Sequence, residues 1–169
     1  MISGMRATLL LCAALAAAAA GLASCGDAEG PTRAQFIAGT DKLCESSNRR
    51  TRTLNRQVSQ AVAGARNDRD RLRRLAPVLE RGYDRLRDNA MAFRTEDPPA
   101  ADADEIEGIR RLYDRQAQFV RSLATAARRG DARRFEALSE QQADVVTRAR
   151  RLTRAYGFKE CGSRKSDAT

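Results

Sequence analysis

Apolar residues recur every three or four positions between Phe36 and Tyr156, with polar and charged residues between them. This spacing is typical of amphipathic helices. The first segment begins at Thr32, a residue type that caps helices, and is expected to run to about Gly64. The line of residues on the apolar face of this helix, its stripe, includes some polar side chains. It consists of Phe36, Thr40, Leu43, Ser47, Leu54, Val58, Ala61 and Ala65.

The second segment starts at Asn67 and Asp68, which form a cap, and it stops before Pro98 and Pro99. Its stripe consists of Leu72, Leu75, Leu79, Gly82 or Tyr83, Leu86, Ala90 and Phe93. Pro77 lies inside this pattern, and a proline removes one helical hydrogen bond and clashes with the preceding turn. We therefore expect either a kink at Pro77 or a break near Ala76.

Two further segments follow the prolines. Asp102, with Glu105 three residues later, is similar to a capping box and predicts the start of the third helix. Gly130 is placed to end that helix, and Asp131 to cap the fourth. The two stripes are Ile106, Ile109, Tyr113, Gln116, Val120, Leu123 and Ala127, and then Phe135, Leu138, Gln142, Val145, Ala149, Leu152 and Tyr156.

The last predicted helix ends at Gly157, and Phe158 is placed to fold back onto its final turn. Long amphipathic helices joined by short connections predict an all-α fold, an antiparallel four-helix bundle with up-down-up-down topology. The expected domain covers residues 32–162. Residues 163–169 are polar and are expected to form a disordered tail.

Residues 1–24 have the composition of a cleaved secretory signal peptide. Arg6 supplies the positive charge, a run rich in leucine and alanine follows, and small residues precede Cys25. The apolar run of about 16 residues is shorter than the roughly 20 that span a bilayer, so a retained transmembrane helix is the weaker alternative. Met1 and Met5 are both candidate start residues.

The residues before Cys25 carry a more specific pattern. Leu22-Ala23-Ser24-Cys25 resembles the lipobox of bacterial lipoproteins, in which an aliphatic residue and two small residues precede the cysteine. The resemblance implies cleavage before Cys25, lipid on its thiol, and anchoring on the extracytoplasmic face of the cell membrane. Two or more acyl chains give stable anchoring where one chain gives marginal binding. Residues 25–31 would then be a short tether.

The chain has four cysteines. Cys12 leaves with the signal peptide, and Cys25 carries lipid under the lipoprotein resemblance. Cys44 and Cys161 remain as an even pair in an exported protein, where disulfides persist. We therefore expect one disulfide between them, and the up-down-up-down register, which brings the end of the fourth helix near Cys44, is consistent with it. Two buried free thiols are the alternative.

Histidine is absent from the chain, which excludes catalytic triads that contain it and the common histidine-rich metal sites. The best metal candidate is the acidic group Asp97, Asp102, Asp104, Glu105 and Glu107, but acidic residues are also favoured at a helix N-terminus. Because the spacing of a calcium loop is missing, we expect no metal, no cofactor and no enzymatic activity.

The net charge of +9 is unevenly distributed. Two runs lack acidic residues, and their basic residues include Arg49, Arg50, Arg52 and Arg56, and then Arg148, Arg150, Arg151 and Arg154. The first and fourth helices are neighbours in the expected bundle, so the two runs should form one basic face. Such a face could contact anionic lipid or an envelope polyanion, or it could be a solvated surface. Nucleic acid is not an expected partner of an exported, anchored protein.

The mature part also resembles small exported helical proteins of high-GC Gram-positive bacteria, through its early cysteine and the ending Tyr156 to Cys161, "YGF-x-x-C". That resemblance implies no activity. The expected function is a non-enzymatic binding or structural module of the cell envelope, with an envelope protein as a possible partner. A ligand-binding or sensory bundle is the alternative, and it requires an internal cavity.

Overall fold

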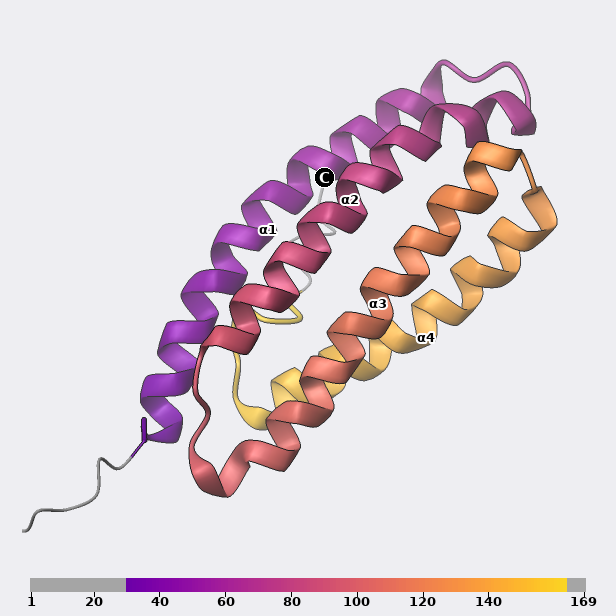
Figure 1. The fold of residues 1–169 in the computed structure, drawn as a ribbon. Coiled ribbons are helices and arrows are strands. Elements are labelled where there is room, and N and C mark those ends of the chain that lie inside the picture. Colours follow the sequence, from indigo (N-terminus) through magenta and orange to yellow (C-terminus); the bar gives the residue numbers. More distant parts are fainter. Residues whose placement is uncertain (1–29, 164–169) are drawn as a thin grey trace, which may run out of the picture.

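The computed structural model describes residues 30–163 and confirms the all-α, antiparallel four-helix bundle (Figure 1). The predicted signal peptide, Cys25 and residues 164–169 of the predicted tail lie outside the described residues. Four long helices alternate in direction, and a short 3₁₀ helix precedes the third. The elements are α1 (Arg33–Ala63), α2 (Asp68–Thr95), η1 (Ala100–Asp102), α3 (Ala103–Arg129) and α4 (Ala132–Tyr156).

The starts of α1, α2 and α4 are fixed by the predicted caps. The Thr32 side chain accepts a hydrogen bond from the Gln35 backbone N–H, and the Gln35 side chain accepts one from the Thr32 backbone N–H. Asn67 accepts from the Asp70 N–H at 2.9 Å, and Asp131 accepts from the Arg134 N–H at 3.0 Å. Each such cap contributes roughly 1 kcal/mol to helix stability.

The ends of α3 and α4 are also as predicted. Gly130 and Gly157 adopt left-handed backbone conformations, with φ of 67° and 113°, which favour glycine. The Phe158 N–H donates to the Thr153 carbonyl at 3.1 Å, and the Phe158 ring is only 3% exposed. The chain therefore turns back sharply after α4 and buries an aromatic ring under its last turn.

Pro77 does not break α2, which runs continuously from Asp68 to Thr95. The proline cannot donate to the carbonyl of Arg73, one turn earlier. Both Arg73 and Pro77 are exposed, so the unpaired carbonyl lies on the solvent side, where water can satisfy it.

The predicted capping box at Asp102 is wrong. The Asp102 side chain makes no capping hydrogen bond, and the 3₁₀ turn η1, which ends at Asp102, leads directly into α3. Its carboxylate instead accepts from the Tyr156 hydroxyl at 2.8 Å and pairs with Arg33 at 3.5 Å. Asp102 thus joins the start of α3 to the two chain-terminal helices.

The buried core has two parts, and α1 contributes to only one of them. The part near the beginning of α1 is aromatic and consists of Phe36, Phe93, Ile106, Ile109, Tyr156, Phe158 and Cys161. The other part lies near the connections at the opposite end and consists of Leu72, Ala76, Leu123, Ala126, Ala127 and Leu138. The buried residues of α1 are Phe36 and Thr40, both in its first ten positions.

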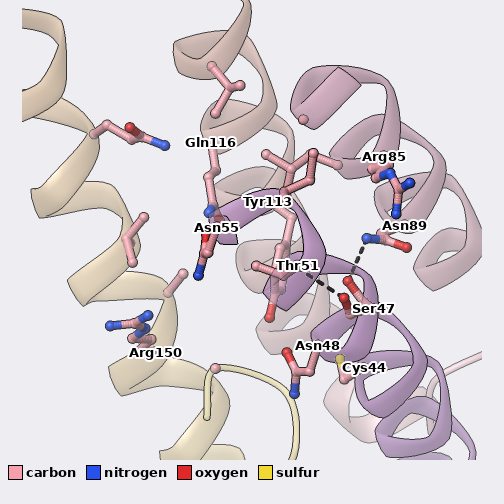
Figure 2. Close-up of a pocket in the computed structure, with 18 of the residues that line it drawn as sticks. Cys44, Ser47, Asn48, Thr51, Asn55, Arg85, Asn89, Tyr113, Gln116 and Arg150 are labelled. Atoms are coloured by element: carbon pink, nitrogen blue, oxygen red, sulfur yellow. Dashed lines mark hydrogen bonds between the residues drawn. The ribbon is translucent and has the colours of Figure 1, made fainter. Parts of the chain in front are cut away.

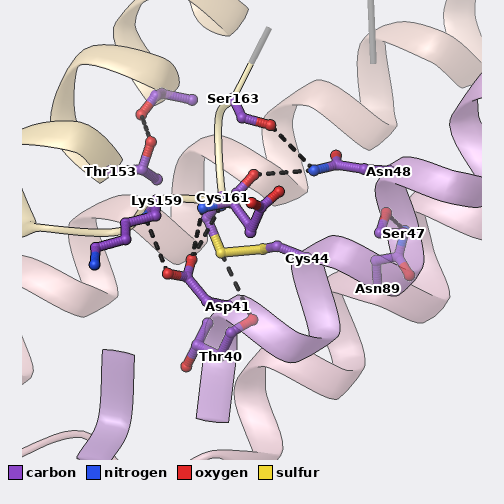
Figure 3. Close-up of a disulfide and its surroundings, with 12 residues drawn as sticks. Thr40, Asp41, Cys44, Ser47, Asn48, Asn89, Thr153, Lys159, Cys161 and Ser163 are labelled. Atoms are coloured by element: carbon purple, nitrogen blue, oxygen red, sulfur yellow. Dashed lines mark hydrogen bonds between the residues drawn. A yellow bond between two sulfur atoms is a disulfide. The ribbon is translucent and has the colours of Figure 1, made fainter. Parts of the chain in front are cut away.

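The predicted disulfide between Cys44 and Cys161 is present, with an S–S distance of 2.03 Å (Figure 3). Asp41 fixes the same segment, since its carboxylate accepts from the backbone N–H groups of Lys159, Glu160 and Cys161 at 2.9 to 3.2 Å. The end of the chain is therefore held against α1 by a covalent bond and by three charge-assisted hydrogen bonds.

Candidate functional site

The helices pack in chain order, with large contacts between α1 and α2, α2 and α3, and α3 and α4. No comparable contact joins α1 to α4 within residues 30–163. Between the start of α1 and Cys44, the C-terminal segment occupies the space between α1 and α4. Beyond Cys44, toward the end of α1, a cavity of about 480 Å³ opens to solvent. We call this cavity the α1–α4 groove. Its walls come from all four helices and from residues 161–163 (Figure 2).

Polar side chains from every helix converge on the groove. Figure 2 shows Asn48 and Asn55 of α1, Gln116 of α3 and Arg150 of α4 around one space. The other labelled lining residues are Cys44, Ser47, Thr51, Arg85, Asn89 and Tyr113. Cores of helical bundles are normally apolar and close-packed, so polar groups from four helices around one cavity are a departure from that rule.

Several of these polar groups are held in place by hydrogen bonds. Asn89 of α2 donates its side-chain N–H to the Ser47 hydroxyl at 2.6 Å, which links two walls. Asn48 donates to the Glu160 carbonyl and to the Ser163 hydroxyl, both at 3.1 Å. The Thr51 hydroxyl donates to the Ser47 carbonyl at 3.0 Å, within its own helix. The wall of the groove nearest the disulfide is therefore preorganised.

Tyr113 lies between the aromatic core and the groove. Its ring meets Phe93 edge-on, with centroids 5.7 Å apart, and it belongs to the groove lining. Burial raises the pKa of Tyr113 to about 12, although the nearby Arg150 cation opposes the shift. The phenol is therefore neutral at ordinary pH and keeps a hydroxyl that can donate a hydrogen bond.

The charges of the lining are of one sign. Arg85 of α2 and Arg150 of α4 line the groove, while none of its described lining residues is aspartate or glutamate. Arg150 is half-buried, and Gly162 lies against it: a methyl group on Gly162 would be 3.1 Å from the Arg150 Cα. The groove thus combines polar and apolar walls, and its charged lining residues are cationic, which favours anionic ligands.

The arginines of the predicted basic face do not share one surface. They lie on several different sides of α1 and α4. On α1, Arg52 and Arg56 follow Asn48 at intervals of four residues and so continue the flank that reaches the C-terminal segment. Arg49 is adjacent and pairs with Glu45 at 2.7 Å, and Arg50 lies on another flank.

On α4, Arg150 and Arg154 are four residues apart and lie on the same flank. Arg148 and Arg151 are three residues apart and lie on a different flank, and both are exposed. Of the predicted basic residues, Arg150 alone belongs to the described lining of the groove, and the others lie on the outer sides of α1 and α4.

Three of the five acidic residues near the start of α3, Asp102, Glu105 and Glu107, form ion pairs. Glu105 pairs with Arg33 at 3.3 Å, and Glu107 pairs with Arg94 at 3.4 Å. Within the described part of the chain, no group of three or more acidic or cysteine residues has the arrangement of a metal site. The short contact between Arg94 and Asp114 adds to this network and raises the pKa of Arg94.

Sequence reasoning did not predict the groove, although a signal was present. Ser47, Gln116 and Gln142 occupy stripe positions where apolar residues were expected, and all three line the groove. Asn89 and Asn55 carried no such signal, because both lie beside the stripes.

Comparison of the chain with protein-family models, with curated proteins and with solved structures finds no match. None of the helices within residues 30–163 combines the length and the apolar character that crossing a membrane requires.

Proposed function

We propose that this protein is a lipid-anchored binding protein of the bacterial cell envelope and that its bundle holds a small molecule in the α1–α4 groove. The observation that carries the proposal is the groove, a cavity of about 480 Å³ with polar groups from all four helices. Ligand sites usually have volumes of roughly 300–1,000 Å³ and combine apolar walls with a few converging polar groups. The proposed role is binding without catalysis.

The apolar part of the lining supports this role. Leu54, Val58, Val78, Leu86 and Val120 face the groove together with the polar residues described above. Such a mixed surface can desolvate the apolar part of a ligand while its polar atoms are hydrogen-bonded. The hydrogen bonds that hold Ser47, Asn48 and Asn89 lower the cost of ordering these side chains when a ligand binds.

The binding role is tested by photo-crosslinking in membranes that contain the full chain. Three probes with the same diazirine-bearing alkyl chain carry a carboxylate, a hydroxyl or a quaternary ammonium head group. At least one probe should label peptides of the groove wall, as mapped by mass spectrometry. Ala143→Phe, at an exposed lining position of α4, should block that labelling, whereas Ala155→Phe, on α4 outside the lining, should not. Absence of groove labelling by all three probes would refute the role.

The proposed anchor rests on Cys25 and on the lipobox-like residues before it. Mass spectrometry of the membrane-bound chain should find a diacylglyceryl group on Cys25 at the N-terminus. Cys25→Ser should move the protein to the soluble fraction, and Cys12→Ser should leave it in the membrane. An unmodified Cys25 in membrane-bound protein would overturn this part of the proposal.

A second candidate function is contact with an anionic surface, either lipid head groups or an envelope polyanion. The observation that favours it is the set of exposed arginines on α1 and α4, the helices on either side of the groove, among them Arg56 and Arg154. Basic residues near an anionic leaflet contribute about 1 kcal/mol each. Full chain carrying Cys25→Ser should bind phosphatidylglycerol vesicles at low salt and release them at high salt. Replacing both Arg56 and Arg154 with Glu should weaken this binding more than replacing Arg50 and Arg151.

A further inference from the structure

The α1–α4 groove has a polar end, close to the disulfide. At this end Ser47 is bonded to Asn89, Asn48 is bonded to Ser163, and Arg150 lies against Gly162. These contacts join α1, α2, α4 and the C-terminal segment at one level of the bundle. Tyr113 of α3 lines the groove at the same end, with its ring against the aromatic core.

The opposite end of the groove is largely apolar. Gly82 of α2 faces Leu54 of α1 and Val120 of α3, because a methyl group on Gly82 would lie 4.0 and 3.8 Å from their side chains. The other aliphatic lining residues toward this end are Val58, Val78, Leu79 and Val146. Four polar residues also line this part of the groove, namely Asn55 beside Leu54, Gln116 one turn from Val120, and Ser139 and Gln142 of α4. The Ser139 hydroxyl donates to the Phe135 carbonyl at 2.8 Å and is thereby satisfied within its own helix.

The positive charge lies at or near the polar end. Arg150 is at that end, and Arg85 is about one turn away along α2 from Asn89. A guanidinium group with a neighbouring neutral phenol offers several hydrogen-bond donors to an anion. No carboxylate belongs to the described lining, and the Asp41 carboxylate, whose charge contributes to the raised pKa of Tyr113, accepts backbone hydrogen bonds from residues 159–161.

We propose that the groove binds a single-chain lipid with an anionic head group. The head lies at Arg150 and Tyr113, and the alkyl chain runs along Leu54 and Val120 toward Val58. This inference rests on the proposed binding function and adds the chemical class of the ligand. The length fits one alkyl chain, since Ser47 and Val58 are separated by roughly 16 Å along α1, and the cavity has a volume of about 480 Å³.

The test compares the three photoactivatable probes on the unaltered full chain in its membrane. The carboxylate probe should label the groove about tenfold more than the hydroxyl probe, the ratio that one charge-assisted hydrogen bond supplies. The quaternary ammonium probe should label it least. Because the alkyl chains are identical, partition into the bilayer does not by itself produce a head-group preference at the groove peptides.

Two variants identify the head-group site. Arg150→Gln should abolish the preference for the carboxylate probe, so that the carboxylate and hydroxyl probes label the groove to similar extents. Arg151→Gln removes the same charge from the neighbouring exposed position of α4, which lies outside the described lining, and should leave the preference intact. Tyr113→Phe should reduce the preference by a smaller factor, since it removes one neutral donor.

The outcomes separate this inference from the function on which it rests. Equal groove labelling by all three probes would overturn the anionic class and would leave binding in the groove standing. An unchanged preference in Arg150→Gln would overturn the placement of the head group. No groove labelling by any probe would remove both proposals. The comparison of probes on the unaltered chain does not depend on the folding of any variant.

Discussion

The two halves of α1 differ in how they are held. In the first half, Phe36 and Thr40 are buried, Asp41 accepts three backbone hydrogen bonds, and Cys44 is covalently joined to Cys161. In the second half, residues 48–63, no residue is buried, and the side that would meet α4 in a closed bundle borders the groove. One helix therefore belongs to the core at one end and to the wall of a cavity at the other.

The difference shows how a small domain can keep a cavity without losing its fold. Apolar burial is concentrated in the aromatic core and in the packing among α2, α3 and α4. The open half of α1 is attached mainly through α2, for example by the hydrogen bond from Arg81 to Gln57 at 3.2 Å. The aromatic core therefore stabilises the fold away from the groove, and the two regions meet at the disulfide, whose cysteines belong to the groove lining.

Removal of the disulfide, which holds the first half of α1, should lower the stability of the protein the most. The bridge closes a loop with a sequence separation of 117, and loops of this length are stabilised by about 4–5 kcal/mol in the chain-entropy model. Cys44→Ser with Cys161→Ser should lower the free energy of unfolding by that order, as measured by urea denaturation. Unchanged stability would mean that Asp41 and the aromatic core hold this end of α1 without the bridge.

The next largest effect should come from truncating one side chain in each half of α1 and comparing the two losses of stability. Phe36 is 3% exposed and contacts three other aromatic rings, so Phe36→Ala should destabilise by about 3–4 kcal/mol. Val58 is only half-buried at the groove, so Val58→Ala should cost about 1 kcal/mol or less. Urea denaturation of both variants checks the comparison, and equal losses would contradict it.

High pH should destabilise the protein through its two buried tyrosines. Burial raises the pKa of both Tyr113 and Tyr156 to about 12, and the hydrogen bond to Asp102 adds to the shift at Tyr156. The unfolded state then loses these protons first, so stability is complete below about pH 10 and falls as pH rises from about 10 to 12. At about pH 11 the loss is roughly 1 kcal/mol for each tyrosine.

Urea denaturation between about pH 8 and 11 measures this decline. The variant with both Tyr113→Phe and Tyr156→Phe should have a flatter profile, because neither phenol remains to titrate. A decline of the same steepness in this variant would assign the effect to other groups.

Filling the groove by a single methyl group should have the smallest effect and the opposite sign. Gly82 lies within α2, where glycine is about 0.5–1 kcal/mol less favourable than alanine. A methyl group there would make ordinary contacts with Val120 and Leu54 at 3.8 and 4.0 Å. Gly82→Ala should therefore raise the thermal midpoint slightly, and a lower midpoint would show that the open half of α1 tolerates no added volume.

The fold was largely predictable because its determinants are local. Thr32, Asn67 and Asp131 cap helices through neighbouring backbone groups, and Gly130 and Gly157 end them through their own conformations. The disulfide followed from the count of cysteines and from the topology. Asp102 failed as a prediction because its partners, Arg33 and Tyr156, are remote in sequence and outweighed the local motif.

The groove was not predictable either, because it depends on the packing of helices that are remote from one another in sequence. A weakened stripe shows only that a helix has a poor apolar face, and neighbouring helices can compensate for it or leave a space. Thr40, a polar interruption in the first stripe, is 1% exposed in the closed end, whereas Ser47, two turns later, lines the groove. The outcome depends on whether α4 approaches, and the pattern along α1 carries no information about that distance.

The bridge between Cys44 and Cys161 also makes the bundle a covalent ring. All three connections between the helices lie within the segment that it closes, at residues 64–67, 96–102 and 130–131. A protease that cuts any one of them leaves a single covalently joined molecule, with new ends at the cut. One break in a turn would therefore not separate the helices that form the groove.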